Sequence, residues 1–268
     1  MEIDSHATLE STAPAAGTLV LVPNALDLGA DPVDLRAVLA DGAIRRAASL
    51  RHWAAENARS ARAFLKRVAA IVPLALPLQE IAIAELPRAR KGSGQPVPTS
   101  EWHDLLQPAL QGHDLGLISD AGLPAVADPG AALVQAAHRA GVPVLALPGA
   151  SSLLMALAAS GLNGQSFAFV GYLPQDGDAR GQRLKELEAL SRRASQTQLL
   201  IETPYRNQAM WMAMLAALAP QTQVTVSCGL SLPSGWSRTD SVAGWRRGAA
   251  PLPPPWPRMP AVFGLLAS

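Results

Sequence analysis

Residues 117–130 read LISDAGLPAVADPG, and this stretch is the most informative part of the sequence about the fold. It opens with a buried apolar strand that ends at Ser119, and a Ser-Asp-Ala-Gly turn follows at the carboxyl end of that strand. Ligands of open α/β sheets bind at this end of the strands, and small residues let a ligand approach the backbone closely. We expect Asp128 to cap a helix whose first residue is Pro129. The stretch therefore predicts a strand, a ligand-facing turn and a helix.

Residues 147–152 read LPGASS and repeat this pattern. They follow an apolar strand expected over 142–147, and they open a helix expected over 151–160 with Ser151 or Ser152 as its N-cap. Either turn alone is not specific, because a connection between a strand and a helix can have this sequence without binding a ligand. Two adjacent strand ends that carry such turns would present both of them to one crevice.

The N-terminal half alternates apolar strands with amphipathic helices. Residues 17–22 (GTLVLV) read as a buried first strand, which Pro23 and Asn24 stop. Continuously apolar strands that alternate with helices predict a parallel sheet covered on both faces. The further elements expected here are a short strand over 47–50 and helices over 32–39, 57–68, 100–110 and 130–140, with Asp31 and Ser100 as N-caps.

The character of the chain changes after about residue 164. Strands are expected over 167–170, 198–202, 223–228 and 261–266, and helices over 181–191 and 207–218; six prolines make residues 251–260 a loop. The sequence therefore predicts an α/β protein of two domains. These are an N-terminal domain with a mostly parallel sheet at 17–163 and a C-terminal domain with a mixed sheet at 164–268, after a disordered tail at 1–16.

The amino-acid composition limits the classes of function that are compatible with the sequence. Charged residues make up 16% and the net charge is +1, so no strongly basic field indicates a nucleic-acid partner; short basic clusters such as residues 88–91 read as solvated turns. Cys228 is the only cysteine, which excludes an intrachain disulfide and favours a small buried side chain. The N-terminus lacks the pattern of a signal peptide, and no window has about 20 clean apolar residues, so we expect a cytoplasmic protein without a membrane contact.

Four motifs in this order carry a family resemblance. They are SDAGxPxxxDPG from residue 119, LPGxSS from 147, GYLP at 171–174 and ETPYR at 202–206. Together they resemble the tetrapyrrole methylase superfamily, the class III S-adenosylmethionine (SAM) methyltransferases. Within it, the chain is most similar to the branch that contains the small-subunit ribosomal RNA 2′-O-cytidine methyltransferase.

The resemblance implies a homodimer of two-domain α/β subunits that binds SAM in a cleft between the domains. It also implies which residues of this chain line the cofactor: Pro23, Ser119, Asp120, Ala121, Gly122, Ser151, Ser152, Tyr172, Leu173, Pro260 and Ala261.

Several family motifs are altered in this chain. The Gly-Asn pair after the first strand is missing from residues 23–29, Glu-Asp-Thr-Arg reads ENAR at 56–59, the His-Asn-Glu triplet is absent, and Gly-Leu-Ser at 229–231 replaces Glu-Leu-Thr. The methyl acceptor therefore stays open between ribosomal RNA and a tetrapyrrole or other small molecule. A non-catalytic SAM-binding homologue is the remaining alternative.

Methyl transfer from a sulfonium needs the acceptor to be held in line with the methyl group, about 3 Å from it. A hydroxyl acceptor also needs a general base, and the pattern singles out none of four carboxylates: Asp27, Glu56, Asp120 and Glu202. We expect Glu56 and Glu202 each to form an ion pair or a turn contact, with Arg59 and Arg206 as the candidate partners. His52, His103, His113 and His138 show no metal spacing. We expect the Met- and Trp-rich helix over 207–218 to pack in the hydrophobic core or at a dimer contact.

Overall fold

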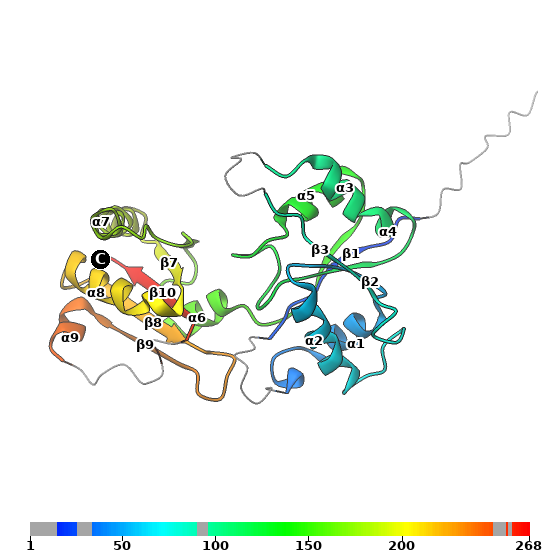
Figure 1. The fold of residues 1–268 in the computed structure, drawn as a ribbon. Helices are drawn as coiled ribbons and strands as arrows, with labels where there is room; N and C mark the ends of the chain where they lie inside the picture. Colours follow the sequence, from blue (N-terminus) through cyan, green and yellow to red (C-terminus); the bar gives the residue numbers. More distant parts are fainter. Residues whose placement is uncertain (1–14, 26–33, 90–95, 249–255, 257–258) are drawn as a thin grey trace, which may run out of the picture. The chain divides into compact units, whose positions relative to one another are not determined.

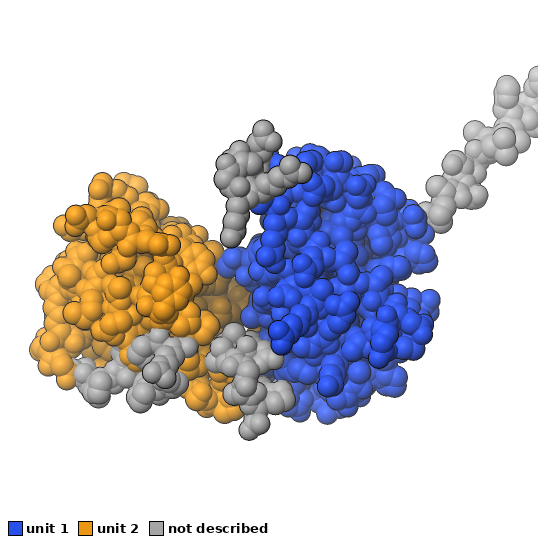
Figure 2. Space-filling model, viewed as in Figure 1, with its two compact units in different colours: residues 1–27, 34–149 blue, residues 28–33, 150–268 orange. Residues whose placement is uncertain are grey.

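The computed structural model describes residues 15–25, 34–89, 96–248, 256 and 259–268. The chain forms two compact units, shown in Figure 2: unit 1 contains residues 1–27 and 34–149, and unit 2 contains residues 28–33 and 150–268. Each unit has its own sheet and its own helices, so the expected α/β class with two sheets is confirmed.

Unit 1 is built on a sheet of five parallel strands in the order β3-β2-β4-β1-β5. The central strands β1 and β4 are buried along their whole length, as their continuous apolar runs predicted. The strand bounds are β1 Leu19–Leu21, β2 His52–Ala55, β3 Ala82–Glu85, β4 Leu115–Ile118 and β5 Val144–Ala146.

Helices cover both faces of this sheet (Figure 1). Val20 and Val22 pack into the cluster formed with α1 and α2, whereas Leu19 and Leu21 pack into the cluster formed with α4 and α5. This alternation follows from the two-residue repeat of a strand. The helices are η1 Leu35–Ala37, α1 Asp41–Ser49, α2 Ala58–Ala69, α3 Thr99–Leu105, α4 Gln107–Leu110 and α5 Ala131–Arg139.

Local predictions at the start of unit 1 and at Ser100 are wrong. Residues 47–50 form no strand, because Ala47 and Ala48 continue α1 at helical spacing and alanine strongly favours a helix. Ser100 lies inside α3, which begins after Pro98. In place of the helix expected from residue 32, the described part has only the short η1, capped by Asp34, while Asp31 lies outside the described residues.

Unit 2 is built on a mixed sheet in the order β6-β7-β10-β8-β9, in which β6 pairs parallel to β7 and the other pairs are antiparallel. Its strands are β6 Phe167–Phe169, β7 Thr197–Glu202, β8 Gln223–Cys228, β9 Trp236–Ser241 and β10 Ala261–Leu266. Its helices are α6 Ser152–Ser160, α7 Gly177–Ala194, η2 Pro204–Arg206, α8 Asn207–Ala217 and α9 Val242–Arg246.

Helix α6 determines where the two units divide. Leu153, Ala156 and Leu157 pack against Leu199 of β7 and Val262 of β10, so α6 belongs to the core of unit 2. The division therefore falls between residues 149 and 150, not near residue 163 where the change in composition placed it.

Candidate functional site

The carboxyl edge of the parallel sheet brings two turns of unit 1 together. Strand β1 runs into Pro23 and Asn24, and its neighbour β4 runs into the turn at residues 119–122. Asn24 and Gly122 pair as an antiparallel bridge, with backbone N–O distances of 2.8 and 2.9 Å in the two directions. The turn after β4 is therefore fixed to the loop after β1.

The Asn24 side chain strengthens this connection. Its amide nitrogen donates hydrogen bonds to the carbonyl oxygens of Ser119, at 3.2 Å, and Asp120, at 2.9 Å, and the residue is only 6% exposed. Buried donors and acceptors need such partners. Sequence reasoning treated Asn24 only as the residue that stops the strand; the signal available was a polar side chain directly after a fully buried strand.

The backbone beyond Ser119 is held in unusual conformations. Gly122 has φ +74°, and no protein atom lies within 4 Å of the position that a Cβ would take there. Ala125 and Ala127 also have positive φ, 68° and 66°, although each carries a side chain. Such conformations cost on the order of 1–3 kcal/mol each and are common at ligand sites. The turn therefore leaves space beside Gly122 that a ligand can fill.

The prediction that Asp128 caps α5 is wrong, because the N-cap is Gly130, whose φ is 130°. Asp128 instead lies near other acidic groups. Burial, and then the negative charge of Glu56, raise the pKa of Asp128 to about 6, while a hydrogen bond with Ser119 acts in the opposite direction. Its carboxyl group is therefore partly protonated near neutral pH.

Glu56 follows β2 at the same edge. Its Oε2 accepts a hydrogen bond of 3.2 Å from the backbone N–H of Asp120, and the Arg88 guanidinium donates to its backbone carbonyl at 3.0 Å. Within the described ranges no ion pair joins Glu56 to Arg59, so of the two expected alternatives Glu56 makes the turn contact, with the backbone N–H of Asp120. The carboxylates of Glu56, Asp120 and Asp128 make this edge negative, which suits a ligand that carries positive charge.

The second predicted turn, after β5, packs against the first strand's loop. A Cβ on Gly149 would lie 2.2 Å from Cγ of Pro23, so only glycine fits beside this buried proline. Gly149 also forms an antiparallel bridge with Leu39. Ser151 is the N-cap of α6 without a side-chain capping bond, and Ser152 is the first, exposed residue of that helix in unit 2.

Unit 2 contains an open pocket of about 550 Å³. Tyr172, 54% exposed, and the buried Leu173 line it, and both are among the residues that the resemblance assigns to the cofactor. The remaining lining residues are Pro174, Gln175, Thr203 and Arg206. The lining of the pocket therefore combines apolar side chains with the cation of Arg206.

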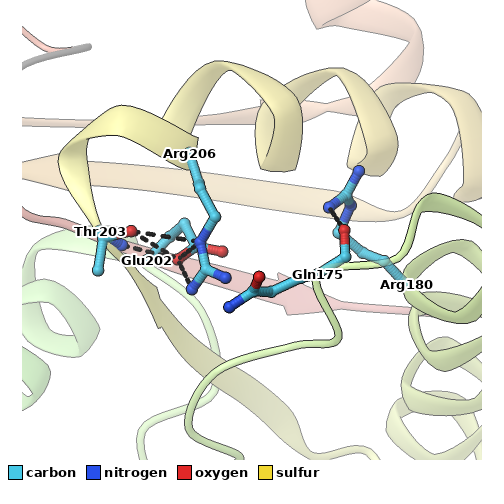
Figure 3. Close-up of polar contacts among 5 residues, drawn as sticks. All are labelled: Gln175, Arg180, Glu202, Thr203 and Arg206. Carbon is cyan, nitrogen blue, oxygen red and sulfur yellow. Dashed lines mark hydrogen bonds and ion pairs between the residues drawn. The ribbon is translucent and has the colours of Figure 1, made fainter.

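A buried ion pair fixes that cation. Arg206 Nη2 lies 2.6 Å from Oε1 of Glu202, which is 4% exposed, and the same oxygen accepts from the backbone N–H of Thr203 at 2.7 Å. Figure 3 shows the side chain of Gln175 pointing toward Arg206. The predicted pair of Glu202 with Arg206 is confirmed. Because Glu202 is buried and its Oε1 is held by Arg206 and Thr203, it is removed from the candidate bases.

Asn207, at the start of α8, positions the segment before β10. Its side-chain amide donates to the carbonyl oxygens of Trp256 at 3.1 Å and Met259 at 2.7 Å, and the residue is fully buried. Pro260 directly follows Met259, and Ala261, the first residue of β10, pairs with Glu202 of β7. Sequence reasoning missed Asn207 as well, because it read the residue only as the start of a helix.

The remaining candidates have structural roles. Cys228 is buried, and burial raises the pKa of its thiol to about 12, as fits a small apolar side chain and not a nucleophile. The rings of His52 and His113 lie 5.3 Å apart. Met210, Trp211 and Met214 belong to the core of unit 2. In the part of the chain that the structure describes, no three His, Cys, Asp or Glu side chains are arranged to hold a metal ion.

Comparison with known proteins defines the class of protein. A family model described as tetrapyrrole (corrin/porphyrin) methylases matches residues 58–234, more than half of the chain. The chain therefore belongs to this family, as its motifs predicted.

Curated relatives have similar sequences over part of their length. A ribosomal RNA small subunit methyltransferase I from Vibrio cholerae is 38% identical over 123 residues, which are 46% of this chain and 41% of that protein. The protein of the same name from Bacillus subtilis is 34% identical over 157 residues, 54% of this chain and 52% of the relative. The chain thus spans about half the length of the curated relatives it matches.

Solved structures share the fold at low sequence identity. The native form of uroporphyrin III C-methyltransferase from Thermus thermophilus has a TM-score of 0.51 and 18% identity, and the match covers 93% of this chain and 97% of that one. The same enzyme complexed with S-adenosyl homocysteine gives a TM-score of 0.50 at 19% identity with the same coverage. Among the described residues, no helix is both long and apolar enough to cross a membrane.

Proposed function

We propose that this chain is a SAM-dependent methyltransferase whose acceptor lies in small-subunit ribosomal RNA. The observation that carries the proposal is the turn at residues 119–122, which Asn24 anchors at the carboxyl edge of a parallel sheet with open space beside Gly122. Membership of the family, the names of the curated relatives and the solved complex with S-adenosyl homocysteine support it.

The residues present fit this cofactor. SAM supplies a methyl group on a cationic sulfur, and the carboxylates of Glu56, Asp120 and Asp128 give the edge of unit 1 the opposite charge. In unit 1, Pro23 and residues 119–122 would hold it, largely through backbone groups. The groups of unit 2 that would contribute are Ser151, Ser152, Tyr172, Leu173, Pro260 and Ala261.

The described side chains would act by positioning and by accepting a proton. Asn24 fixes the carbonyl oxygens of Ser119 and Asp120, so these acceptors need no reordering when a ligand binds. Glu56 and Asp120 remain the candidates to take a proton from an acceptor hydroxyl group, since Glu202 is engaged with Arg206. Asp27 lies outside the described residues.

We further propose a cytoplasmic homodimer. The low charged fraction of 16% supports it, as do the apolar side chains of Leu145, Leu154 and Met212, which are 44%, 55% and 56% exposed. Equilibrium sedimentation at micromolar concentration should give twice the chain mass of 28.0 kDa. A mass of one chain across the concentration range would contradict the dimer.

The acceptor is tested by transfer of labelled methyl groups. Small ribosomal subunits from a strain that lacks this protein should accept label from SAM in their RNA, whereas subunits from the parent strain should accept none because the position is already methylated. SAM binding without label in RNA would exclude this acceptor and favour a small-molecule methylase or, with the missing His-Asn-Glu triplet, a non-catalytic homologue. Absence of SAM binding in calorimetry would contradict the proposal as a whole.

A further inference from the structure

One face of helix α2 carries exposed cations. Ala61, Phe64, Leu65 and Val68 form its buried face, and Arg59, Arg62 and Lys66 lie exposed on the opposite side. With 3.6 residues per turn, positions i, i+3 and i+7 line one stripe, here about 10 Å long at 1.5 Å per residue. We call Arg59, Arg62 and Lys66 the α2 stripe.

The charges of the α2 stripe are not neutralised by the described side chains. Helix α2 contains four cations and no acid, and none of the three stripe residues forms an ion pair within the described ranges. The cations of the neighbouring α1 differ, because Arg45 pairs with Asp41 at 2.7 Å and Arg46 with Asp114 at 2.8 Å. A charge run is usually a solvated face, but such faces usually mix both signs, as α7 does.

The α2 stripe begins at the candidate site. Asn57 is the N-cap of α2 and directly follows Glu56 at the carboxyl edge of the sheet. At the start of the helix, Glu85 accepts a hydrogen bond from the backbone N–H of Ala58 at 2.9 Å. Arg88 adds a further cation at this edge through its hydrogen bond to the Glu56 carbonyl. The stripe thus leads away from the negative edge along one exposed surface.

We propose that the α2 stripe binds the phosphate backbone of the RNA that carries the methyl acceptor. This inference rests on the proposed function, since it assigns the surface that holds the polyanionic part of that substrate. Phosphate contacts from Lys and Arg position a nucleic acid without reading its sequence. The carboxylates at the edge repel phosphates, so the arrangement of opposite charges directs the RNA backbone to α2. A net charge of +1 does not oppose this, because the cations are gathered locally.

The test compares two triple variants with equal loss of charge. Arg59→Gln, Arg62→Gln and Lys66→Gln remove the α2 stripe, and Arg139→Gln, Lys185→Gln and Arg193→Gln remove three exposed cations from α5 and α7. Glutamine keeps a high helix propensity, so both variants should fold. Binding of a fluorescein-labelled single-stranded RNA of 20 nucleotides is measured from 50 to 200 mM salt, together with SAM binding and methylation of small ribosomal subunits.

The stripe variant should bind this RNA at least about tenfold more weakly, with a slope of log K against log salt that is smaller by about 2, and should bind SAM as the wild type does. The control variant should behave like the wild type. Equal RNA affinity and slope in the two variants, while the wild type still methylates ribosomal RNA, would overturn the inference alone. If the wild type binds SAM but neither binds nor methylates RNA, both the inference about the α2 stripe and the RNA acceptor of the proposed function are wrong.

Discussion

Each unit anchors a distant loop with one buried asparagine, and the two anchors differ in what surrounds them. Asn24 of unit 1 donates to the carbonyl oxygens of Ser119 and Asp120, about 95 residues further along the chain. Asn207 of unit 2 donates to those of Trp256 and Met259, about 50 residues further along. Both anchored segments adjoin residues that the family resemblance assigns to the cofactor.

Both anchors are neutral amides, and the difference lies in how the surrounding segment is held. In unit 1 the turn is shaped by its backbone, with positive φ at Gly122, Ala125 and Ala127. In unit 2 the anchor lies beside a buried ion pair of Glu202 with Arg206. Side-chain changes should therefore affect the stability of unit 2 most, whereas the candidate site of unit 1 should be most sensitive to changes of backbone conformation.

The largest effect on stability is expected from breaking the buried ion pair. Glu202→Leu leaves Arg206 without its partner and the Thr203 N–H without its acceptor, so the free energy of unfolding of unit 2 should fall by about 3 kcal/mol. Glu186→Leu is the matched control, since its pair with Arg183 is exposed and should contribute less than about 0.5 kcal/mol. Urea denaturation measures both changes. Equal losses would show that burial of the pair has no energetic consequence.

Each of the two asparagine anchors should contribute somewhat less to the free energy of unfolding than the buried ion pair does. Asn24→Leu and Asn207→Leu remove two hydrogen bonds each and leave buried carbonyl oxygens unsatisfied, at a cost of about 2 kcal/mol. Hydrogen exchange resolved by peptide should show faster exchange at residues 119–125 in the first variant and at 259–266 in the second. If exchange in these segments does not change, the asparagines are not their anchors.

A smaller effect, of opposite sign, is expected at Asp128. The pKa of Asp128 in the folded protein, about 6, lies above the usual 3.8. The stability that protonated Asp128 contributes is therefore fully present below pH 4 and is lost as the pH rises through 6. Asp128→Asn cannot ionise and should be about 1–2 kcal/mol more stable than the wild type at pH 7. Near pH 4 the two proteins should unfold alike. A constant difference from pH 4 to 7 would contradict the raised pKa.

The sequence predicted the elements that are buried on both faces. Strands β1, β4 and β10 are continuous apolar runs and appear close to their expected bounds. Strand β3 was missed because it is an exposed edge, and β9 (WSRTDS) because a polar sequence gives no strand signal. Their pairing depends on neighbours far away in the chain, which local patterns do not contain.

The candidate site was predictable only in part. The turns at residues 119–122 and 149–152 were recognisable from small residues after apolar strands. The roles of Asn24 and Asn207 depend on partners about 95 and 50 residues away, so neither could be derived from spacing. The role of Asp128 was predicted wrongly because the Asp-Pro-Gly sequence also fits a helix cap, whereas the positive φ of Ala127 and Gly130 makes Gly130 the N-cap of α5.

The proposed role of the turn containing Gly122 is to bind SAM, and a comparison of two glycine variants tests this role. Gly122 and Gly141 have nearly equal φ, +74° and +70°, and a Cβ at either position would meet no atom within 4 Å. Gly122→Val and Gly141→Val should therefore strain the backbone equally, by about 1–3 kcal/mol, but only the first places a side chain at the carboxyl edge of the sheet. Calorimetric titration should show a loss of SAM affinity of about 100-fold or more in Gly122→Val and wild-type affinity in Gly141→Val, at similar thermal midpoints without ligand. Wild-type SAM affinity in Gly122→Val would show that this turn does not bind the cofactor.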